Sequence, residues 1–384
     1  MSWEKVKLGD ITDSCLGKML DQKKNRGEFQ PYLANVNVRW GAFDLEDLPQ
    51  MRFEENEQKR YGLRYGDLVV CEGGEPGRCA IWKEQIPNMK IQKALHRVRV
   101  HNGLDYRYLY YWFLWSGKRG ALEQYFTGAT IKHMPGQKLK EVLIDKPPLE
   151  IQKRIADILS AYDDLIDNNQ KQIKLLEEAA QRLYKGWFVR DNVPDGWEQR
   201  SLGDVASVLR RGISPKYDDN GKYLVISQKC IRQSIMDIRE ARRESKEYTP
   251  ELNLQDKDTV ICSTGTGTLG RVGQVFGVYP DTTFDSHVTL VRTEKYQNLF
   301  YQAIKHQQDF LMGMGRGSTN QQELYRGVIE NLQILIPTQE ILNKAERLFS
   351  TIHDKITALN SQIGLFVEAR DRLLPKLMSG EIEV

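Results

Sequence analysis

The sequence lacks long apolar runs. Its longest apolar stretches are interrupted by charged residues well before the roughly 18 residues that a membrane-spanning helix needs. Residues 1–5 (MSWEK) also lack the charged-then-apolar pattern that opens a secretory signal peptide. These absences argue against a membrane protein and against a secreted one, and we expect a cytoplasmic protein.

Cysteine is scarce, and the cysteines do not group. None of them forms a close pair or has a histidine partner at zinc-binding spacing, so we expect reduced thiols, mostly buried, and no metal site. The five cysteines are Cys15, Cys71, Cys79, Cys230 and Cys262.

The chain also lacks a large excess of either charge. Its 384 residues carry a net charge of +3, and residues 1–148 carry +5 from 24 basic and 19 acidic side chains. A polyanion-binding signal is therefore absent from the bulk composition. Any binding of nucleic acid has to come from local patches of basic and polar side chains.

A duplication is the most informative feature of the chain. Trp3 and Glu4 return as Trp197 and Glu198, a shift of 194 positions. Each copy begins with about 145 residues of mixed pattern, in which short β-like runs alternate with Gly-rich turns. Further equivalent positions are 8–10 and 202–204, Asp67 and Asp258, 69–71 and 260–262, His96 and His287, 128–130 and 317–319, and Pro147 and Pro337.

Each mixed part is followed by a helical pattern. Residues 151–187 and 341–377 place apolar side chains at steps of mostly three and four, with Asn169 inside the first stripe. Such a helix spans on the order of 55 Å at 1.5 Å per residue. A single stripe of this kind is typical of a helical hairpin or a coiled-coil dimer, but two in one chain favour an intramolecular antiparallel pair.

We therefore predict an α+β protein with two similar mixed α/β domains and two long antiparallel helices that form an intramolecular coiled coil with pseudo-two-fold symmetry. The predicted parts are domain one (1–148), the central helix (149–190), domain two (191–338), and the distal helix with the C-terminal tail (339–384). Duplex DNA has local two-fold axes, so two such domains suit two half-sites. Because the domains differ while the helices repeat, the expected target is bipartite and asymmetric.

Three segments resemble a known family. Residues 147–160 (PPLEIQKRIADILS), 183–188 (LYKGWF) and 373–382 (LLPKLMSGEI) are similar to the conserved regions of type I restriction-modification specificity subunits. The distal helix opens with residues 338–341 (TQEI), which depart from the Pro-Leu-Glu-Gln type of entry that the family favours.

The resemblance implies a non-catalytic, DNA-reading subunit. Its partners would be double-stranded DNA, two modification subunits that methylate adenine N6, and restriction subunits that translocate and cut DNA. S-adenosylmethionine, ATP and Mg²⁺ would then bind the partners, and no cofactor would bind this chain. In agreement, residues 146–149 (KPPL) are not an adenine-methylation motif, and the Gly-rich residues 265–272 (GTGTLGRV) lack the Lys-Ser/Thr pair of a phosphate-binding loop.

DNA contacts require basic groups for phosphates, and amide or guanidinium groups for base edges. Polar loops and strand-like segments at repeat-related positions supply candidates of both kinds, although a plain solvated surface role remains open for each residue. His96 and His287, just before β-like runs, are expected to be structural. The candidates are Lys23, Lys24, Arg26, Asn35, Asn37, Arg39, Arg78, Thr130, Lys132, His133, Arg210, Arg211, Lys216, Gln228, Lys229, Arg232, Arg271, Ser318, Thr319, Asn320 and Gln321.

Two other functions compete with the DNA-reading subunit. The chain could be the specificity half of a fused restriction-methylation enzyme, but such a fusion needs several hundred further residues, and this sequence begins and ends at the repeat boundaries. It could also be a structural coiled-coil adaptor, for which two large divergent domains with polar loops would be superfluous.

Overall fold

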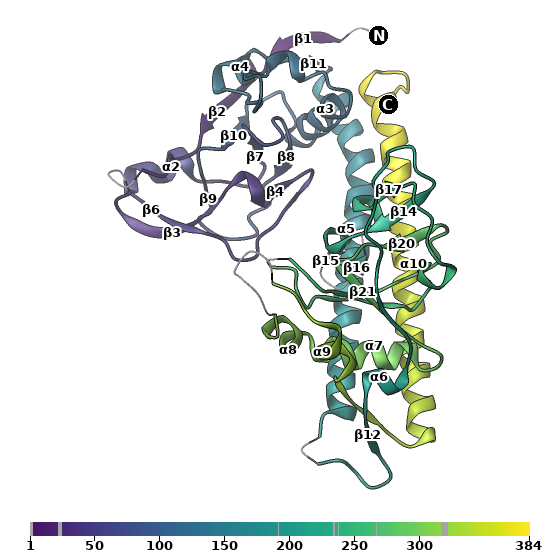
Figure 1. Ribbon diagram of the computed structural model, residues 1–384. Helices are drawn as coiled ribbons and strands as arrows, with labels where there is room; N and C mark the ends of the chain where they lie inside the picture. Colours follow the sequence, from purple (N-terminus) through teal and green to yellow (C-terminus); the bar gives the residue numbers. More distant parts are fainter. Residues whose placement is uncertain are drawn as a thin grey trace. The chain divides into compact units, whose positions relative to one another are not determined.

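The computed structural model describes residues 3–21, 25–190, 192–232, 235–236, 238–265, 267–315 and 322–384 (Figure 1). The chain divides into two compact units. Unit 1 consists of Met1–Ile166 and Leu365–Val384, and unit 2 consists of Asp167–Gly364. The two long helices, α5 (Leu149–Phe188) and α10 (Gln339–Met378), each contribute residues to both units.

Unit 1 contains four small sheets, with strand orders β1-β11, β2-β10-β7-β8, β6-β3-β9 and β4-β5. Strand β7 pairs antiparallel with β10 and β8, and all four of its residues are buried. The strands of unit 1 are β1 (Glu4–Lys7), β2 (Thr12–Leu16), β3 (Glu28–Leu33), β4 (Val38–Arg39), β5 (Ala42–Phe43), β6 (Gln50–Phe53), β7 (Leu68–Cys71), β8 (Cys79–Ile81), β9 (Lys90–Ile91), β10 (Leu95–Val100) and β11 (Leu143–Lys146).

The main core of unit 1 forms around helix α3. Asp105 caps this helix by accepting hydrogen bonds from the backbone N–H groups of Arg107 (2.8 Å) and Tyr108 (3.2 Å). Aromatic side chains of α3 pack in one cluster with Leu159 of α5 and Leu374 of α10. The helices of the mixed part are α1 (Leu8–Ile11), α2 (Gln58–Tyr61), α3 (Tyr106–Lys118) and α4 (Gly136–Glu141).

Unit 2 repeats this plan with a larger central sheet. Its strand orders are β12-β22, β13-β21-β18-β19-β16-β15 and β17-β14-β20. Its strands are β12 (Glu198–Ser201), β13 (Ala206–Arg211), β14 (Tyr223–Ile226), β15 (Ile231–Arg232), β16 (Ile235–Met236), β17 (Arg242–Glu244), β18 (Thr259–Cys262), β19 (Val272–Gln274), β20 (Thr282–Phe284), β21 (Val288–Thr293) and β22 (Gln333–Ile336). Its short helices are α6 (Leu202–Val205), α7 (Gln297–His306), α8 (Gln308–Gly313) and α9 (Arg326–Glu330).

The duplication extends to an ion pair with a buried carboxylate in each unit. Asp67 accepts two hydrogen bonds from the Arg99 guanidinium, both at 2.7 Å. Asp258 accepts two from Arg292, at 2.7 and 2.6 Å. Both carboxylates are 1% exposed and precede strands β7 and β18, so the repeated aspartates of the sequence have the same structural role.

The two long helices pack against each other in antiparallel directions within each unit. In unit 2, Ile173 clusters with Leu359, and the Asn169 amide donates to Gln362 Oε1 at 3.1 Å. In unit 1, the Arg370 guanidinium on α10 donates to Asp163 Oδ1 on α5 at 2.6 Å. The predicted α+β class, with two similar mixed domains and two long helices, is confirmed.

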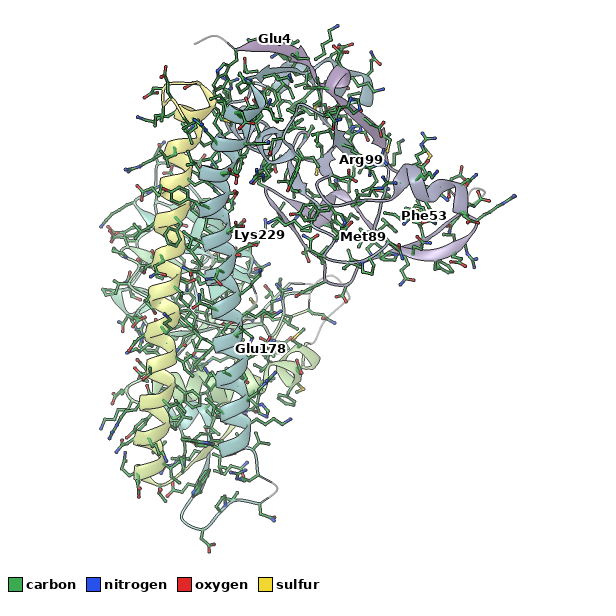
Figure 2. All side chains as sticks on the ribbon, turned by 180° about the vertical axis from the view of Figure 1, so that it is seen from behind. Glu4, Phe53, Met89, Arg99, Glu178 and Lys229 are labelled. Carbon is green, nitrogen blue, oxygen red and sulfur yellow. The ribbon has the colours of Figure 1, made fainter. Side chains whose placement is uncertain are left out.

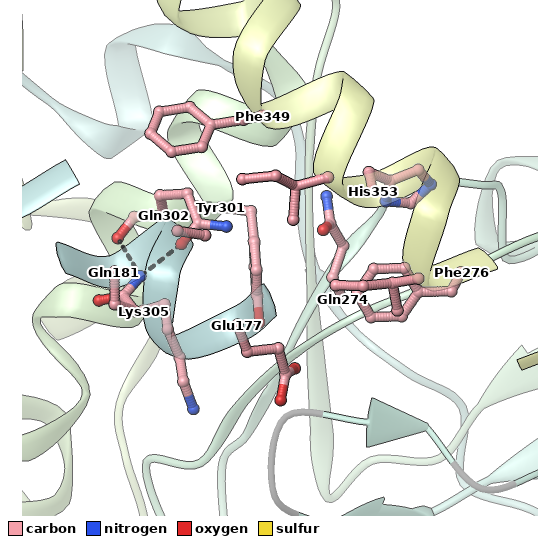
Figure 3. Close-up of a pocket in the computed structure, with 12 residues that line it drawn as sticks. Glu177, Gln181, Gln274, Phe276, Tyr301, Gln302, Lys305, Phe349 and His353 are labelled. Atoms are coloured by element: carbon pink, nitrogen blue, oxygen red, sulfur yellow. Dashed lines mark hydrogen bonds between the residues drawn. The ribbon is translucent and has the colours of Figure 1, made fainter. Parts of the chain in front are cut away.

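A buried carboxyl group lies in a small cavity of about 20 Å³ inside unit 2 (Figure 3). Glu177 of α5 lines this cavity together with Lys305 and His353. Its Oε1 atom has no hydrogen-bond partner among the described residues, while Lys305 Nζ donates to Gln308 Oε1 at 2.7 Å. Burial raises the pKa of Glu177 to about 7, although the positive charge of Lys305 lowers it.

We expect Glu177→Gln to stabilise the protein at pH 8. A carboxyl group whose pKa is raised on folding does not destabilise the protein below about pH 4.5. The free energy of unfolding then falls as the pH rises toward 7, because the buried group must ionise. The shift corresponds to at most about 3 kcal/mol at pH 8. Urea unfolding at pH 5 and pH 8 measures the difference, and Glu178→Gln, at the exposed neighbour labelled in Figure 2, is the control. Equal effects of both variants would contradict the expectation.

Candidate nucleic-acid interface

A Gly-rich turn between β7 and β8 holds the first candidate arginine. The backbone N–H of Cys71 donates to the Arg78 carbonyl at 2.8 Å, and Gly74 and Gly77 adopt positive φ angles of 78° and 90°. Arg78 then donates to the Asn35 carbonyl at 3.1 Å and to Glu75 Oε2 at 2.9 Å. The turn thus joins two candidates that lie 43 positions apart in the sequence.

The segment with Thr130, Lys132 and His133 closes on the same turn. His133 forms isolated bridges with Gly73 and with Thr127, and the N–H of the next residue, Met134, donates to the Glu72 carbonyl at 2.8 Å. A Cβ atom on Gly73 would lie 2.9 Å from His133 Nδ1, so glycine permits this close approach. Thr130, Lys132 and His133 are all exposed. We call Asn35, the turn 72–78 and the segment 127–133 loop cluster one.

Unit 2 builds the same arrangement, which we call loop cluster two and which consists of Gln228, the turn 263–271 without Thr266, and Glu323. The N–H of Cys262 donates to the Arg271 carbonyl at 2.9 Å, and the N–H of Leu324 donates to the Ser263 carbonyl at 2.8 Å. Glu323 forms an isolated β-bridge with Thr264, as His133 does with Gly73 in loop cluster one. The backbone scaffold of the turn is therefore common to both units.

An amide side chain lies against the turn in each cluster. A Cβ atom on Gly74 would lie 3.1 Å from Asn35 Nδ2, and one on Gly265 would lie 3.1 Å from Gln228 Nε2. Asn35 and Gln228 each begin a short 3-10 turn that follows the equivalent strands β3 and β14. Amide groups can make paired hydrogen bonds to adenine, and each turn has one beside it. In this structure Gln228 Oε1 is buried without a hydrogen-bond partner among the described residues, so its side chain would have to turn outward to reach a base edge.

The side chains around the shared scaffold differ between the clusters. The exposed imidazole of His133 in cluster one corresponds to Glu323 in cluster two, which pairs with Arg211. Arg211 also donates to the Leu324 carbonyl at 3.0 Å. In cluster two, Thr264 Oγ1 lies 2.5 Å from His287 Nδ1. One backbone plan therefore presents different polar groups in the two units.

Residues 1–178 and 194–365 match the family of the type I restriction modification DNA specificity domain. The chain belongs to this family. It is 30% identical over 416 residues to the type I restriction enzyme MjaIX specificity subunit of Methanocaldococcus jannaschii, with 100% of this chain and 94% of that protein covered. The MjaVIII specificity subunit of the same organism is 23% identical over 415 residues, with 100% and 93% covered.

The fold is also similar to a solved structure. The crystal structure of the type I restriction-modification S subunit from M. genitalium matches with a TM-score of 0.53 at 17% identity, covering 98% of this chain and 96% of that one. The family membership makes this chain a specificity subunit with DNA recognition domains. No helix in the described parts of the chain is long and apolar enough to cross a membrane.

The other predicted contact residues are scattered over both specificity domains. Arg39 donates to the Val36 carbonyl at 2.7 Å, and Arg210 pairs with Glu251 at 2.7 Å. Asn37 is 7% exposed and uses its amide for the Ala34 N–H and the Asp44 carbonyl, so the fold occupies both of its polar groups. The side chains of Arg26, Lys216 and Lys229 are exposed, the last as labelled in Figure 2. Lys23, Lys24, the Arg232 side chain, Ser318, Thr319, Asn320 and Gln321 lie outside the described residues.

Two exposed apolar residues, one within loop cluster one and one next to it, were not predicted from the sequence to contact DNA. Val36, next to Asn35, is 65% exposed, and Ile131 is 64% exposed. Apolar side chains on a DNA-binding surface can contact the thymine methyl group. Their position between predicted polar candidates is a signal that the sequence already contained.

Burial shifts the pKa values of three titratable side chains near the turns in the direction that favours their neutral forms. His96 is 1% exposed, its Nε2 lies 2.9 Å from the Met134 carbonyl, and burial lowers its pKa. Burial raises the pKa of the Cys262 thiol to about 12 and also raises that of Cys71. The described residues contain no group of three side chains suited to hold a metal ion.

Proposed function

We propose that this chain reads a bipartite, asymmetric double-stranded DNA target for a type I restriction-modification complex, with loop cluster one on one half-site and loop cluster two on the other. The observation that carries the proposal is the pairing of a common turn scaffold with different polar side chains. A repeated scaffold gives two equivalent readers, and divergent side chains give them different sequences.

The long helices have two roles in this proposal. Because α5 and α10 each contribute to both units, their length limits how far apart the two readers can bind and so sets the gap of unread bases. We further propose that they help to dock two methyltransferase subunits, and that restriction subunits join this complex. Catalysis, with S-adenosylmethionine, ATP and Mg²⁺, then belongs to the partners, and this chain is non-catalytic by itself.

Exchanging one domain should change one half-site only. Residues 1–148 would be replaced by the equivalent domain of a relative, with the positions that pack on α5 and α10 kept as they are. We expect the methylome of cells that carry the variant and its modification subunit to show one new half-site, the old second half-site and the old gap. The reciprocal exchange of residues 191–338 is the matched control.

A narrower variant links the exchange to the loop clusters. Gln228→Ala should relax recognition at one or two positions of the half-site read by unit 2, with a loss of about 1–3 kcal/mol of discrimination at each. Asn35→Ala should do the same only in the other half-site. If either substitution altered both half-sites, or if a domain exchange did, the two loop clusters would not be independent readers.

A further inference from the structure

Domain one of unit 1 contains a cleft of about 450 Å³ that lies outside loop cluster one. Gly62, Arg64, Trp82, Glu84, Asn88 and Lys90 are among the residues that line it. Lys90, the first residue of β9, lines the cleft, and it follows Met89, which is labelled in Figure 2. The volume falls within the range of small-ligand sites.

Lys90 is the unusual residue of this cleft. The residue is only 2% exposed, and its Nζ donates to the Asn88 carbonyl at 2.7 Å. A Cβ atom on Gly62 would lie 3.7 Å from the same Nζ, so the ammonium group lies among lining residues of the cleft. Within the described part of the chain, no carboxylate forms an ion pair with Lys90. A buried ammonium without a counter-ion costs free energy unless a ligand supplies the missing charge.

The duplicated fold provides an internal comparison. In unit 1, Leu33 and Ile91 are partners in the parallel pair β3-β9, and in unit 2 Ile226 and Phe284 are partners in β14-β20. Counting back one residue, the position of Lys90 is occupied by Thr283 in unit 2. Thr283 is fully buried, and its hydroxyl donates to the Leu252 carbonyl at 2.8 Å. The fold therefore does not need a positive charge at this position.

The other charged groups of the cleft are one guanidinium and one carboxylate, so with Lys90 the named groups carry one positive charge in excess. Arg64 is exposed at the cleft and adds a guanidinium. Glu84 is the opposing carboxylate, and its Oε1 accepts a hydrogen bond from the Tyr65 backbone N–H at 3.2 Å. Burial lowers the pKa of Lys90, and an anion beside its ammonium group would oppose that effect.

We propose that this cleft is an anion site in which Lys90 and Arg64 bind a phosphate group. An ammonium and a guanidinium provide several donors of the kind that recognise phosphate oxygens. Two sources carry this chemistry, a backbone phosphate of bound DNA and a small phosphorylated molecule.

The first test uses inorganic phosphate and the full chain without partners or DNA, so it does not depend on the proposed function. Phosphate, compared with chloride at the same ionic strength, should raise the thermal unfolding midpoint by about 2–4 °C at ten times its Kd. Lys90→Met should abolish this response and leave a folded protein, because it removes a charge that lacks a partner. Lys93→Met, at an exposed lysine two residues beyond Ile91, should respond like the parent. An equal response of the parent and Lys90→Met would overturn the proposal.

The second test distinguishes the sources by DNA binding at several salt concentrations. If the ligand is a backbone phosphate, Lys90→Met should weaken binding similarly for all sequences and lower the salt dependence by about one unit of slope. If the ligand is a small molecule, DNA binding should stay unchanged while phosphate stabilisation is lost. If Lys90→Met keeps both the stabilisation by phosphate and the DNA binding of the parent, the anion site is refuted. If the parent itself shows no sequence-specific DNA binding, only the proposed function is refuted.

Discussion

Replacing Asp258 with alanine should destabilise unit 2 by about 3–5 kcal/mol, because the Arg292 guanidinium would remain buried without its carboxylate. Asp258 is 1% exposed, Arg292 is 9% exposed, and Asp258 also accepts a hydrogen bond from the Gln255 N–H at 2.7 Å. Among the described residues, Arg292 would then keep only the carbonyl groups of Glu251 and Asn253 as hydrogen-bond partners. Hydrogen exchange followed by mass spectrometry would report the loss separately for peptides of each unit.

The repeat supplies the comparison for this variant. Asp67→Ala removes the equivalent carboxylate of unit 1, but the Arg99 side chain is 27% exposed, so water can solvate it and the cost should be smaller. Glu294→Ala, at an exposed position after β21, should change stability little. If Asp258→Ala is no more destabilising than Asp67→Ala, or if faster exchange appears in unit 1 alone, the buried Arg292 guanidinium does not depend on the Asp258 carboxylate.

The duplication could be predicted because it rests on residues with strong physical constraints. Asp67 and Asp258 are buried carboxylates that each pair with an arginine, and the apolar residues of β7 and β18 fill the two cores, so both sets remain recognisable in sequence. The long helices were predictable for a similar reason. A long helix with a continuous apolar stripe is stable only when another element buries that stripe.

The loop clusters could be predicted only in part. The Gly-rich turns indicated where the backbone bends. They did not indicate that the Arg78 side chain, which is 17% exposed, would bond to Glu75 and to the Asn35 carbonyl, and its contact with DNA stays a prediction. The contact of Asn35 with Gly74, however, joins positions 39 residues apart, and no periodicity connects such positions. Asn37 was predicted to contact DNA, but its amide bonds to the backbone of Ala34 and Asp44. An asparagine in a polar strand-like segment looks the same in sequence in both cases.

Lys90 was missed because its significance depends on burial. In sequence it is one lysine among 55 basic residues, and a solvated surface position is the ordinary expectation. Only the strand register, which places it opposite Tyr32 and makes Thr283 its counterpart, identifies it as a charge that the fold does not require. Internal duplication is therefore useful twice, first for predicting the fold and then for separating scaffold residues from specialised ones.

Lengthening both long helices should change the gap between the half-sites while keeping both half-sites. Asn169 of α5 bonds to Gln362 of α10 at 3.1 Å, so four residues inserted next to each of them would extend the pair without slipping its register. Four helical residues add about 6 Å, and bases lie about 3.4 Å apart along the duplex. We expect the preferred gap to grow by one or two bases in the methylome.

Three variants separate length from other effects of this insertion. Asn169→Ala removes the bond to Gln362 without a change of length and should keep the original gap. An insertion in α5 alone should shift Ile173 away from Leu359 and lower stability, because the apolar stripes no longer match. A matched insertion of two residues turns the helices by about 200° and should abolish methylation at both half-sites. A folded, methylation-competent complex with the four-residue insertion that still prefers the original gap would show that the helices do not set the spacing. The gap would then be determined within the specificity domains or by the methyltransferase partners.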